Sequence, residues 1–369
     1  MAVIERIEIT LVDLPPKADA PGPGEAAATG REAVVVRAAD ADGEVGTGYA
    51  CTAGTGGSSI VRLLHDHLAP DLIGRDADLV EDAWRFLLSR AGGAASGIAS
   101  LALAAVDTAM WDLRCRRAGL PLHIMAGGAQ AGVPLYEGET GGLALSPEEL
   151  AERVLEARER GFGGCAVAVG MPRVTGDAAR LEAARAAVGA EFELMADAAH
   201  ALNPDEAARR AWRLEPLDLA WLAEPLPPGD VAGHARLATG TSLPIAAGGS
   251  LHALSQVAEF LRLGACSVVR PDAAVLGGIT PWLKCAHLAE AHGLPVCPPG
   301  ATELHVALAC AVPNARWAGH APQLPEITLT GLAVREGRAI PSDEPGLGIA
   351  WDQDAIERRR VNELTLLVD

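Results

Sequence analysis

The stretch GFGGCAVAVG at residues Gly161–Gly170 decides the fold of this chain. Its apolar residues Cys165–Val169 form a short run that is typical of a buried strand. Helical patterns lie on either side of it, at Ser146–Arg160 and Gly176–Val188. Glycines separate the run from both helices, as is common where helices and strands end. The sequence therefore predicts a helix, a buried strand and a second helix.

The same alternation recurs along the chain. Further strands, each preceded by a helical pattern, are expected at Glu193–Asp197, Ala220–Pro225, Pro244–Gly249, Ser267–Asp272, Pro295–Pro298 and Arg316–His320. Val133–Glu139 fits the first strand of the series. Such recurrence predicts a parallel β/α barrel, whose reactive groups lie at the C-terminal ends of the strands. At that end of Gly161–Gly170 the side chains are only alanine and valine.

The N-terminal region lacks this alternation. Strands are expected at Ala2–Leu14, Glu32–Ala39 and Val45–Ala50, and a tight turn joins the last two. Between the first two strands, Pro15–Gly30 is too rich in proline, glycine and alanine to pack, so we expect a mobile loop. A small antiparallel sheet followed by helices is therefore predicted.

Three regions follow from these patterns. The chain of 369 residues is long enough for a barrel of about 200–250 residues and a second unit of about 100. We expect an α+β capping domain at residues 1–125, the barrel domain at 126–322 and a C-terminal segment at 323–369. That segment is expected to return to the capping domain, because chain ends commonly lie close together at the surface.

Composition narrows the class of function. The net charge of −18 argues against nucleic acid or an anionic membrane as a partner, because both are bound by surplus lysine and arginine. No long uncharged apolar segment is present and the N-terminus alternates like a strand, so we predict a cytoplasmic protein. The seven cysteines contain no C-x-x-C pair, which argues against a disulfide framework or a zinc–thiolate site.

Short motifs mark the predicted strand ends. They are LMADA at 194–198, WLAEP at 221–225, PIAAGG at 244–249, and VVRPD at 268–272 followed by LGGIT. Together with AVDTAMWDL at 105–113 and PGLGIAWD at 345–352, the order of cap, barrel and cap resembles the enolase superfamily, in its mandelate racemase/muconate lactonizing branch. The resemblance spans essentially the whole chain. It implies a TIM-type (β/α)7β barrel with an α+β capping domain formed by the N-terminal region and the C-terminal tail.

The resemblance also implies a chemistry. In this family a carboxylate substrate chelates one Mg²⁺ ion, and the metal neutralises negative charge while a proton is removed beside the carboxylate. The resulting enediolate collapses by racemisation, β-elimination or cycloisomerisation. Three carboxylates, at the ends of three consecutive barrel strands, hold the ion, since Mg²⁺ prefers oxygen ligands in octahedral geometry.

Carried to this chain, the metal site is incomplete. Asp197 takes the place of the first ligand and Glu224 that of the second, but Gly249 stands where the third carboxylate belongs. The two lysines that this branch commonly carries on the second strand are replaced by Ala166 and Ala168. Mg²⁺ binding is therefore expected to be possible but weak, because two carboxylates and water hold the ion less firmly than three carboxylates.

Candidate reactive residues remain around this incomplete site. Asp272 lies where the branch places a catalytic lysine or the aspartate of an Asp–His pair, and the place of the partner histidine falls near Pro299. His200 is the imidazole nearest the expected reaction centre, so Asp272 and His200 are the predicted acid/base residues. Arg270 and His320 are predicted to hold a substrate carboxylate, since both lysines are missing.

Two glutamates at the end of the first strand offer a replacement for the missing ligand. Glu137 and Glu139 are two residues apart, and residues at that spacing on a strand point the same way. If that direction is inward, one of them would replace the third carboxylate.

Two classes of function follow. The first is an isomerase or dehydratase (lyase) that abstracts a proton alpha to the carboxylate of a small hydroxy, sugar or amino acid. A variant of it works without metal, with Asp272 and His200 as an acid/base pair. The second class is a non-catalytic ligand-binding protein or degenerate paralogue that keeps the fold. In both, the expected partner is a small-molecule carboxylate, and the resemblance implies a homo-oligomer.

Overall fold

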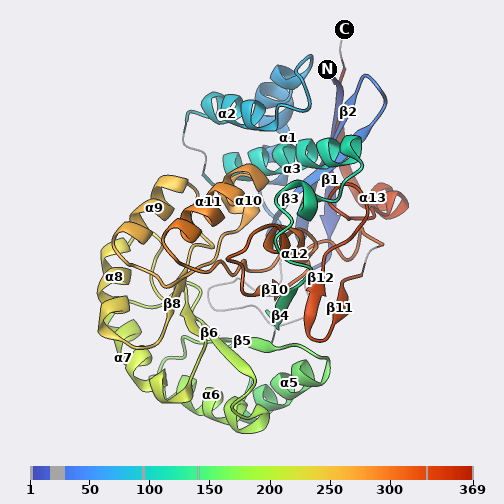
Figure 1. The fold of residues 1–369 in the computed structure, drawn as a ribbon. Helices are drawn as coiled ribbons and strands as arrows, with labels where there is room; N and C mark the ends of the chain where they lie inside the picture. Colours follow the sequence, from blue (N-terminus) through green and yellow to red (C-terminus); the bar gives the residue numbers. More distant parts are fainter. Residues whose placement is uncertain are drawn as a thin grey trace.

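The computed structural model describes residues 3–16, 30–93, 96–138, 140, 142–329 and 331–367. The predicted loop Pro15–Gly30 lies mostly outside these residues. Figure 1 shows the sheet and helices of the N-terminal region above the barrel, with the two chain ends close together beside that sheet. Among the described helices, none combines the length and the apolar character that a membrane crossing needs.

The N-terminal region forms an antiparallel sheet. β1 (Ile4–Leu14), β2 (Arg31–Asp40) and β3 (Val45–Thr52) pair in chain order, and β13 (Arg360–Leu367) pairs with the other edge of β1. Apolar and β-branched residues of β1 and β2 are buried, and such residues favour strands. The predicted sheet and the return of the C-terminal tail to the cap are both confirmed.

Helix α3 packs directly on this sheet. The helices of the region are α1 (Gly57–Leu63), η1 (Leu64–Leu68), η2 (Pro70–Leu72), α2 (Val80–Arg90), α3 (Ile98–Ala118) and α4 (Leu122–Met125). A Cβ atom added at Gly46 or Gly48 of β3 would lie 2.2 Å from the backbone of Ala109 in α3. The close approach of helix and strand therefore depends on glycine at both positions.

The barrel strands run parallel in chain order. They are β4 (Val133–Glu137), β5 (Gly164–Ala168), β6 (Glu193–Asp197), β7 (Trp221–Ala223), β8 (Ile245–Ala247), β9 (Val268–Val269) and β10 (Ala318–His320). The predicted strand at Pro295–Pro298 is reduced to a parallel bridge at Val296, which lies between Val269 and Ala315. β10 then pairs with β4, so the pairings return to the first strand.

Seven helical connections alternate with these eight strand positions. They comprise α5 (Pro147–Glu159), α6 (Val174–Val188), α7 (Pro204–Leu214) with η3 (Glu215–Leu217), α8 (Val231–Gly240), α9 (Leu254–Arg262), α10 (Ala273–Leu276) with α11 (Ile279–Ala291), and α12 (Thr302–Ala311). After β10 the chain forms the hairpin β11 (Ala333–Arg335) and β12 (Arg338–Ile340), then α13 (Gln353–Arg359). The arrangement is the predicted (β/α)7β barrel.

The strand register decides which side chains enter the barrel. Tyr136 of β4 belongs to a buried cluster with Met195 and Trp221, and this cluster fills the barrel interior. Ala166 lies opposite Met195 in the register, and Ala168 lies opposite Asp197, so both alanines share the interior side with them. The intervening Cys165, Val167 and Val169 instead pack against the surrounding helices. The two alanines therefore stand on the side where reactive groups would lie.

A buried ion pair fixes the turn that follows β5. The Asp177 carboxylate accepts hydrogen bonds from the backbone N–H groups of Gly170 and Met171, each at 3.1 Å. It also accepts from Arg210 Nε at 2.8 Å, and both charged side chains are almost fully buried. Arg180 donates to the carbonyl oxygen of Ala168 at 2.7 Å. The end of the Gly161–Gly170 stretch is thus held by charged groups from neighbouring helices.

Asp107 joins the cap to the barrel. Its carboxylate accepts from the backbone N–H of Thr280 at 2.9 Å and from the Thr280 hydroxyl at 2.6 Å. The Thr280 oxygen in turn accepts from Trp111 Nε1 at 2.9 Å. Burial raises the pKa of Asp107 to about 7, although the hydrogen bonds from Thr280 oppose the shift.

This carboxyl group predicts a pH-dependent stability. Because the pKa of Asp107 is about 7 in the folded chain and about 3.9 in an unfolded chain, the folded state binds the proton more tightly. The stabilisation is fully present below about pH 4 and is lost as the pH rises through about 7, to a total of at most about 4 kcal/mol. Urea denaturation across this range measures it. In Asp107→Asn the free energy of unfolding should change less with pH than in the parent. Parallel pH profiles for the two proteins would show that Asp107 is not the group responsible.

Candidate functional site

The C-terminal ends of the barrel strands bring a partly buried ion pair into the mouth of the barrel. Asp197 is the last residue of β6, and Arg270 directly follows β9. Arg270 Nη1 donates to Asp197 Oδ2 at 2.9 Å. The arginine is only 5% exposed, whereas the Asp197 side chain is 29% exposed. The carboxylate therefore faces the mouth and the guanidinium lies behind it.

Glu224 reaches this group through an unusual backbone conformation. Ala223 before it already faces the barrel interior, so an extended chain would turn the next side chain away. Glu224 instead has a positive φ of 43°, and its Oε1 accepts from the backbone N–H of Gly249 at 2.8 Å. Positive φ is costly for a residue other than glycine and is frequent at functional sites.

His200 lies beside Glu224 on a second strained loop. Ala199 and His200 are consecutive residues with positive φ, at 43° and 64°. His200 Nδ1 lies 2.9 Å from the carbonyl oxygen of Leu226, and Nε2 lies 2.8 Å from Ser250 Oγ. Because a carbonyl oxygen only accepts, Nδ1 carries the hydrogen and Nε2 accepts from the Ser250 hydroxyl. The imidazole thus presents its basic nitrogen toward Ser250.

The charges of the mouth influence one another. Burial raises the pKa of Glu224, and the positive charge of Arg270, the neighbouring His200 and the Gly249 N–H oppose that shift. His200 Nδ1 is 3.7 Å from Glu224 Oε2. Burial alone would lower the pKa of Arg270, but Asp197, Tyr136 and Glu224 outweigh it and raise that pKa further. The guanidinium therefore keeps its positive charge inside the barrel.

Asp272 has a structural task in addition to its predicted role. It is the N-cap of α10, where its Oδ1 accepts from the backbone N–H groups of Ala274 at 2.8 Å and Val275 at 3.4 Å. The fully buried His305 contacts the same turn, because its Nε2 accepts from the N–H of Ala273 at 3.1 Å. The acid/base role of Asp272 stays a prediction.

His320 does not join the group at the mouth. In the register β10 lies beside β4, with Gly319 opposite Tyr136 and His320 opposite Glu137. Since Tyr136 occupies the interior, His320 and Glu137 lie on the outer side of the wall. His320 Nδ1 is 3.3 Å from Glu137 Oε1, and Arg160 donates to Glu137 at 2.8 Å.

The position of Glu137 corrects one expectation. Its carboxylate does not point inward, so it does not replace the missing metal ligand, because Tyr136 takes the interior side of β4. Glu139, the other candidate, lies outside the described residues.

The residues at the mouth do not fit a Mg²⁺ ion. Asp197 is paired with Arg270, Glu224 is held by a backbone N–H, and Gly249 offers no side chain. Within the described ranges, no group of three or more His, Cys, Asp or Glu side chains has the arrangement of a metal site. Two carboxylates, one of them paired with a guanidinium, provide too little negative charge to hold this ion firmly.

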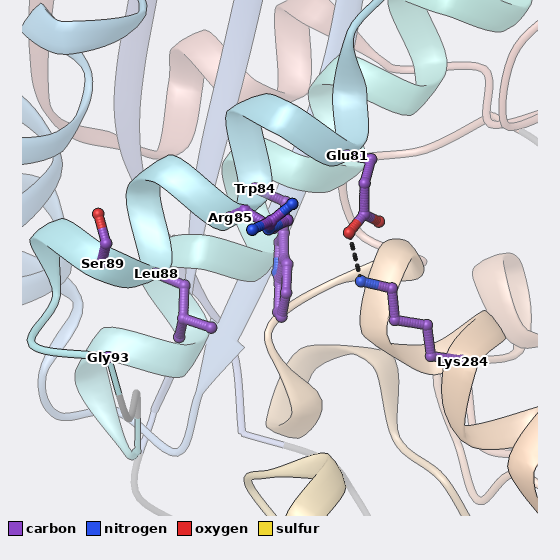
Figure 2. A pocket seen from close by; sticks show the side chains of 7 residues that line it. All are labelled: Glu81, Trp84, Arg85, Leu88, Ser89, Gly93 and Lys284. Carbon is purple, nitrogen blue, oxygen red and sulfur yellow. Dashed lines mark hydrogen bonds and ion pairs between the residues drawn. The ribbon is translucent and has the colours of Figure 1, made fainter.

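Among the described residues, two cavities lie outside the group formed by Asp197, Glu224, His200 and Arg270. Figure 2 shows one of about 490 Å³ between α2 and α11, where Lys284 Nζ is 2.5 Å from Glu81 Oε1 and 4.7 Å from the Trp84 ring centroid. A second, of about 390 Å³, is lined by Glu303 of α12, by His320 at the end of β10 and by residues of the C-terminal segment. Glu81 and Lys284 of the first cavity pair with each other, and neither cavity is lined by Asp197, Glu224, His200 or Arg270.

Comparison with known proteins identifies relatives over the whole chain. A family model described as enolase C-terminal domain-like matches residues 149–355, and one described as the mandelate racemase / muconate lactonizing enzyme N-terminal domain matches residues 7–127. The L-talarate/galactarate dehydratase of Salmonella typhimurium is 35% identical over 325 residues, which cover 88% of this chain and 81% of that protein. The 3,6-anhydro-alpha-L-galactonate cycloisomerase of Streptomyces coelicolor is 32% identical over 361 residues, 97% of this chain and 100% of that protein.

A solved structure shows the same architecture. The L-talarate dehydratase from Polaromonas sp. JS666, crystallised with Mg and L-glucarate, superposes with a TM-score of 0.92 at 32% identity, and the match covers 100% of both chains. A capped β/α barrel with polar groups at its C-terminal mouth is the architecture of a barrel enzyme. By its matched domains and relatives, the chain belongs to the mandelate racemase/muconate lactonizing enzyme branch of the enolase superfamily, a family of isomerases and lyases. The family resemblance of the sequence is thereby confirmed.

Proposed function

We propose that the protein is an isomerase or lyase that acts on a small sugar acid at the barrel mouth, with His200 as the proton-transfer residue and without bound Mg²⁺. The observation that carries the proposal is the pairing of His200 Nε2 with Ser250 Oγ at 2.8 Å, beside Glu224 and the Arg270–Asp197 ion pair. Sugar acids are the substrate class because the relatives are named for dehydration of talarate and galactarate and cycloisomerisation of an anhydrogalactonate.

The chemistry follows from the charge arrangement. Breaking the C–H bond alpha to the substrate carboxylate transfers the proton to His200 Nε2, the imidazole nitrogen that carries no hydrogen, in place of its hydrogen bond from Ser250. The imidazolium that forms lies 3.7 Å from Glu224 through Nδ1. The fixed positive charge of Arg270 lowers the energy of negative charge that develops on the substrate, because charges interact strongly away from water. Return of the proton to carbon gives an isomer, and its delivery to a departing hydroxyl gives dehydration.

Several features of the family mechanism are replaced in this proposal. Ala166 and Ala168 supply no amine, Gly249 supplies no carboxylate, and Pro299 supplies no imidazole. We therefore expect slow turnover and a Mg²⁺ affinity that is weak at best. The small-molecule carboxylate partner, the homo-oligomeric state and the cytoplasmic location stay predictions.

The test is a solvent-exchange screen. The purified protein is incubated in D₂O with a library of aldonic and aldaric acids, once with EDTA and once with Mg²⁺, and proton NMR follows the α-position. We expect loss of the α-proton signal, or a dehydrated product, for at least one acid in EDTA. Activity that needs Mg²⁺ would contradict the metal-free mechanism.

A ligand-binding protein without turnover is the second candidate. It is favoured by the engagement of Asp272 in capping α10, which leaves His200 without a second acid/base group of established geometry. In the same screen this candidate predicts that one acid raises the melting temperature of the protein while its α-proton signal stays unchanged. An exchanged α-proton would exclude it.

A further inference from the structure

We infer that the guanidinium of Arg270 replaces the divalent metal ion as the permanent cation of this barrel mouth. The inference rests on the proposed function for its meaning in catalysis. Its own evidence is the set of contacts at the mouth, and its test measures metal binding instead of turnover.

The position of Arg270 is the first step. The two carboxylates that remain from the expected metal site are Asp197 and Glu224, at the ends of neighbouring strands. Arg270 comes from the far side of the barrel and binds Asp197 directly, at 2.9 Å. Its charge also acts on Glu224. A single guanidinium therefore supplies the positive charge that both carboxylates would otherwise draw from solution.

The permanence of this charge is the second step. An arginine side chain does not lose its proton under the conditions in which proteins fold. Arg270 is 5% exposed and lies among the barrel interior residues, beside Tyr136. The charge can neither be removed by a change of pH nor moved out to water without unpacking the barrel. A Mg²⁺ ion that approached Asp197 would meet a fixed like charge.

The third step is the missing ligand. A Cβ atom at Gly249 would lie 3.1 Å from Glu224 Oε1, a tight contact, so a glutamate at this position would lie beside the remaining carboxylates after a small shift of the Glu224 side chain. Gly248 has a positive φ of 130°, but Gly249 has none, so its backbone accepts a side chain. With glycine at position 249, the charges of Asp197, Glu224 and Arg270 sum to one net negative charge. Three carboxylates without the arginine would carry three. Both changes act in the same direction, against a divalent cation.

Metal titration of four proteins tests the inference. Isothermal titration with Mg²⁺ and electron paramagnetic resonance with Mn²⁺ are applied to the parent, Gly249→Glu, Arg270→Gln and the double variant. The parent should show no saturable binding below about 1 mM, since affinity follows the number of charged ligands. The double variant should bind at least about 100-fold more tightly than the parent, because it has three carboxylates and no guanidinium.

The single variants separate the two causes. If Arg270 excludes the metal, the Gly249→Glu variant should bind Mg²⁺ and Mn²⁺ much more weakly than the double variant. Equal affinity of these two proteins would overturn the inference, as would tight Mn²⁺ binding by the parent. Arg270→Lys in the Gly249→Glu background is the matched control, because it keeps a positive charge and should also bind weakly.

Folding of the variants is checked by circular dichroism and thermal unfolding. If the glutamine variants do not fold, the parent, Gly249→Glu and its Arg270→Lys derivative still carry the test: tight Mn²⁺ binding by any of the three contradicts the inference, and weak binding by all three supports it. The outcome is independent of the solvent-exchange screen. An inactive protein that binds no metal would overturn the proposed function alone, and a protein that is active in EDTA but binds Mn²⁺ tightly would overturn this inference alone.

Discussion

Replacing Asp177 with alanine is expected to lower the free energy of unfolding by about 3–5 kcal/mol, the usual cost of removing one partner from a buried ion pair. The substitution leaves the guanidinium of Arg210 buried without its charge partner, and Arg210 is only 3% exposed. It also removes the acceptor for the N–H groups of Gly170 and Met171. Urea denaturation followed by tryptophan fluorescence measures the loss.

Two control variants make the result specific. Asp177→Asn keeps an oxygen for the backbone N–H groups but not the charge, so it should lower the free energy of unfolding less than Asp177→Ala does. Asp230→Ala removes a half-buried carboxylate that caps α8 by accepting from Gly233 N–H at 2.8 Å, and the loss of such a cap costs about 1 kcal/mol. Similar losses for Asp177→Ala and Asp230→Ala would show that the buried pair contributes little.

Replacing His200 with glutamine is expected to lower kcat/KM by about 100- to 10,000-fold, the contribution of a positioned acid/base group. Glutamine fills a similar space and can still donate to the Leu226 carbonyl, but it cannot accept a proton at neutral pH. The measurement uses a sugar acid found in the solvent-exchange screen.

Other variants separate proton transfer from structure. Ser250→Ala should reduce turnover less than His200→Gln, because it removes only the hydrogen bond that orients Nε2. His287→Gln, at an exposed side chain on α11, should leave turnover unchanged. A His200→Gln protein with full activity and unchanged stability would remove His200 from the mechanism.

The barrel was predictable because its signal is local and repeated. Apolar strands between helical patterns mark each repeat, and Gly161–Gly170 carries both the strand and its limits. The prediction at Pro295–Pro298 was less accurate, since the strand there is reduced to a bridge at Val296. Prolines flank that bridge and lack the N–H that a strand partner requires.

The chemistry of the mouth depends on contacts that a sequence pattern does not encode. Arg270 meets Asp197 across 73 positions, and His200 meets Ser250 across 50. Asp272 was recognisable by its motif, but its hydrogen bonds to the start of α10 come from local geometry.

Backbone conformation and register account for two further differences. Glu224 enters the mouth only through its positive φ. His320 lies outside the wall only because of the register of β10 on β4. Ser250 could have been suspected from the sequence only because it follows Gly249 at a strand end. A serine at such a position forms no distinctive motif.

The pairing of β1 with β13 has a consequence for how the molecule is made. Ile9 of β1 lies opposite Leu364 of β13, so β1 pairs with a strand that follows the whole barrel in the chain. The edge of β1 stays unpaired while the barrel is synthesised, and exposed strand edges promote association between chains. The antiparallel sheet is therefore completed only after the barrel has been synthesised, and a chain that lacks β13 would leave that edge of β1 open to other chains.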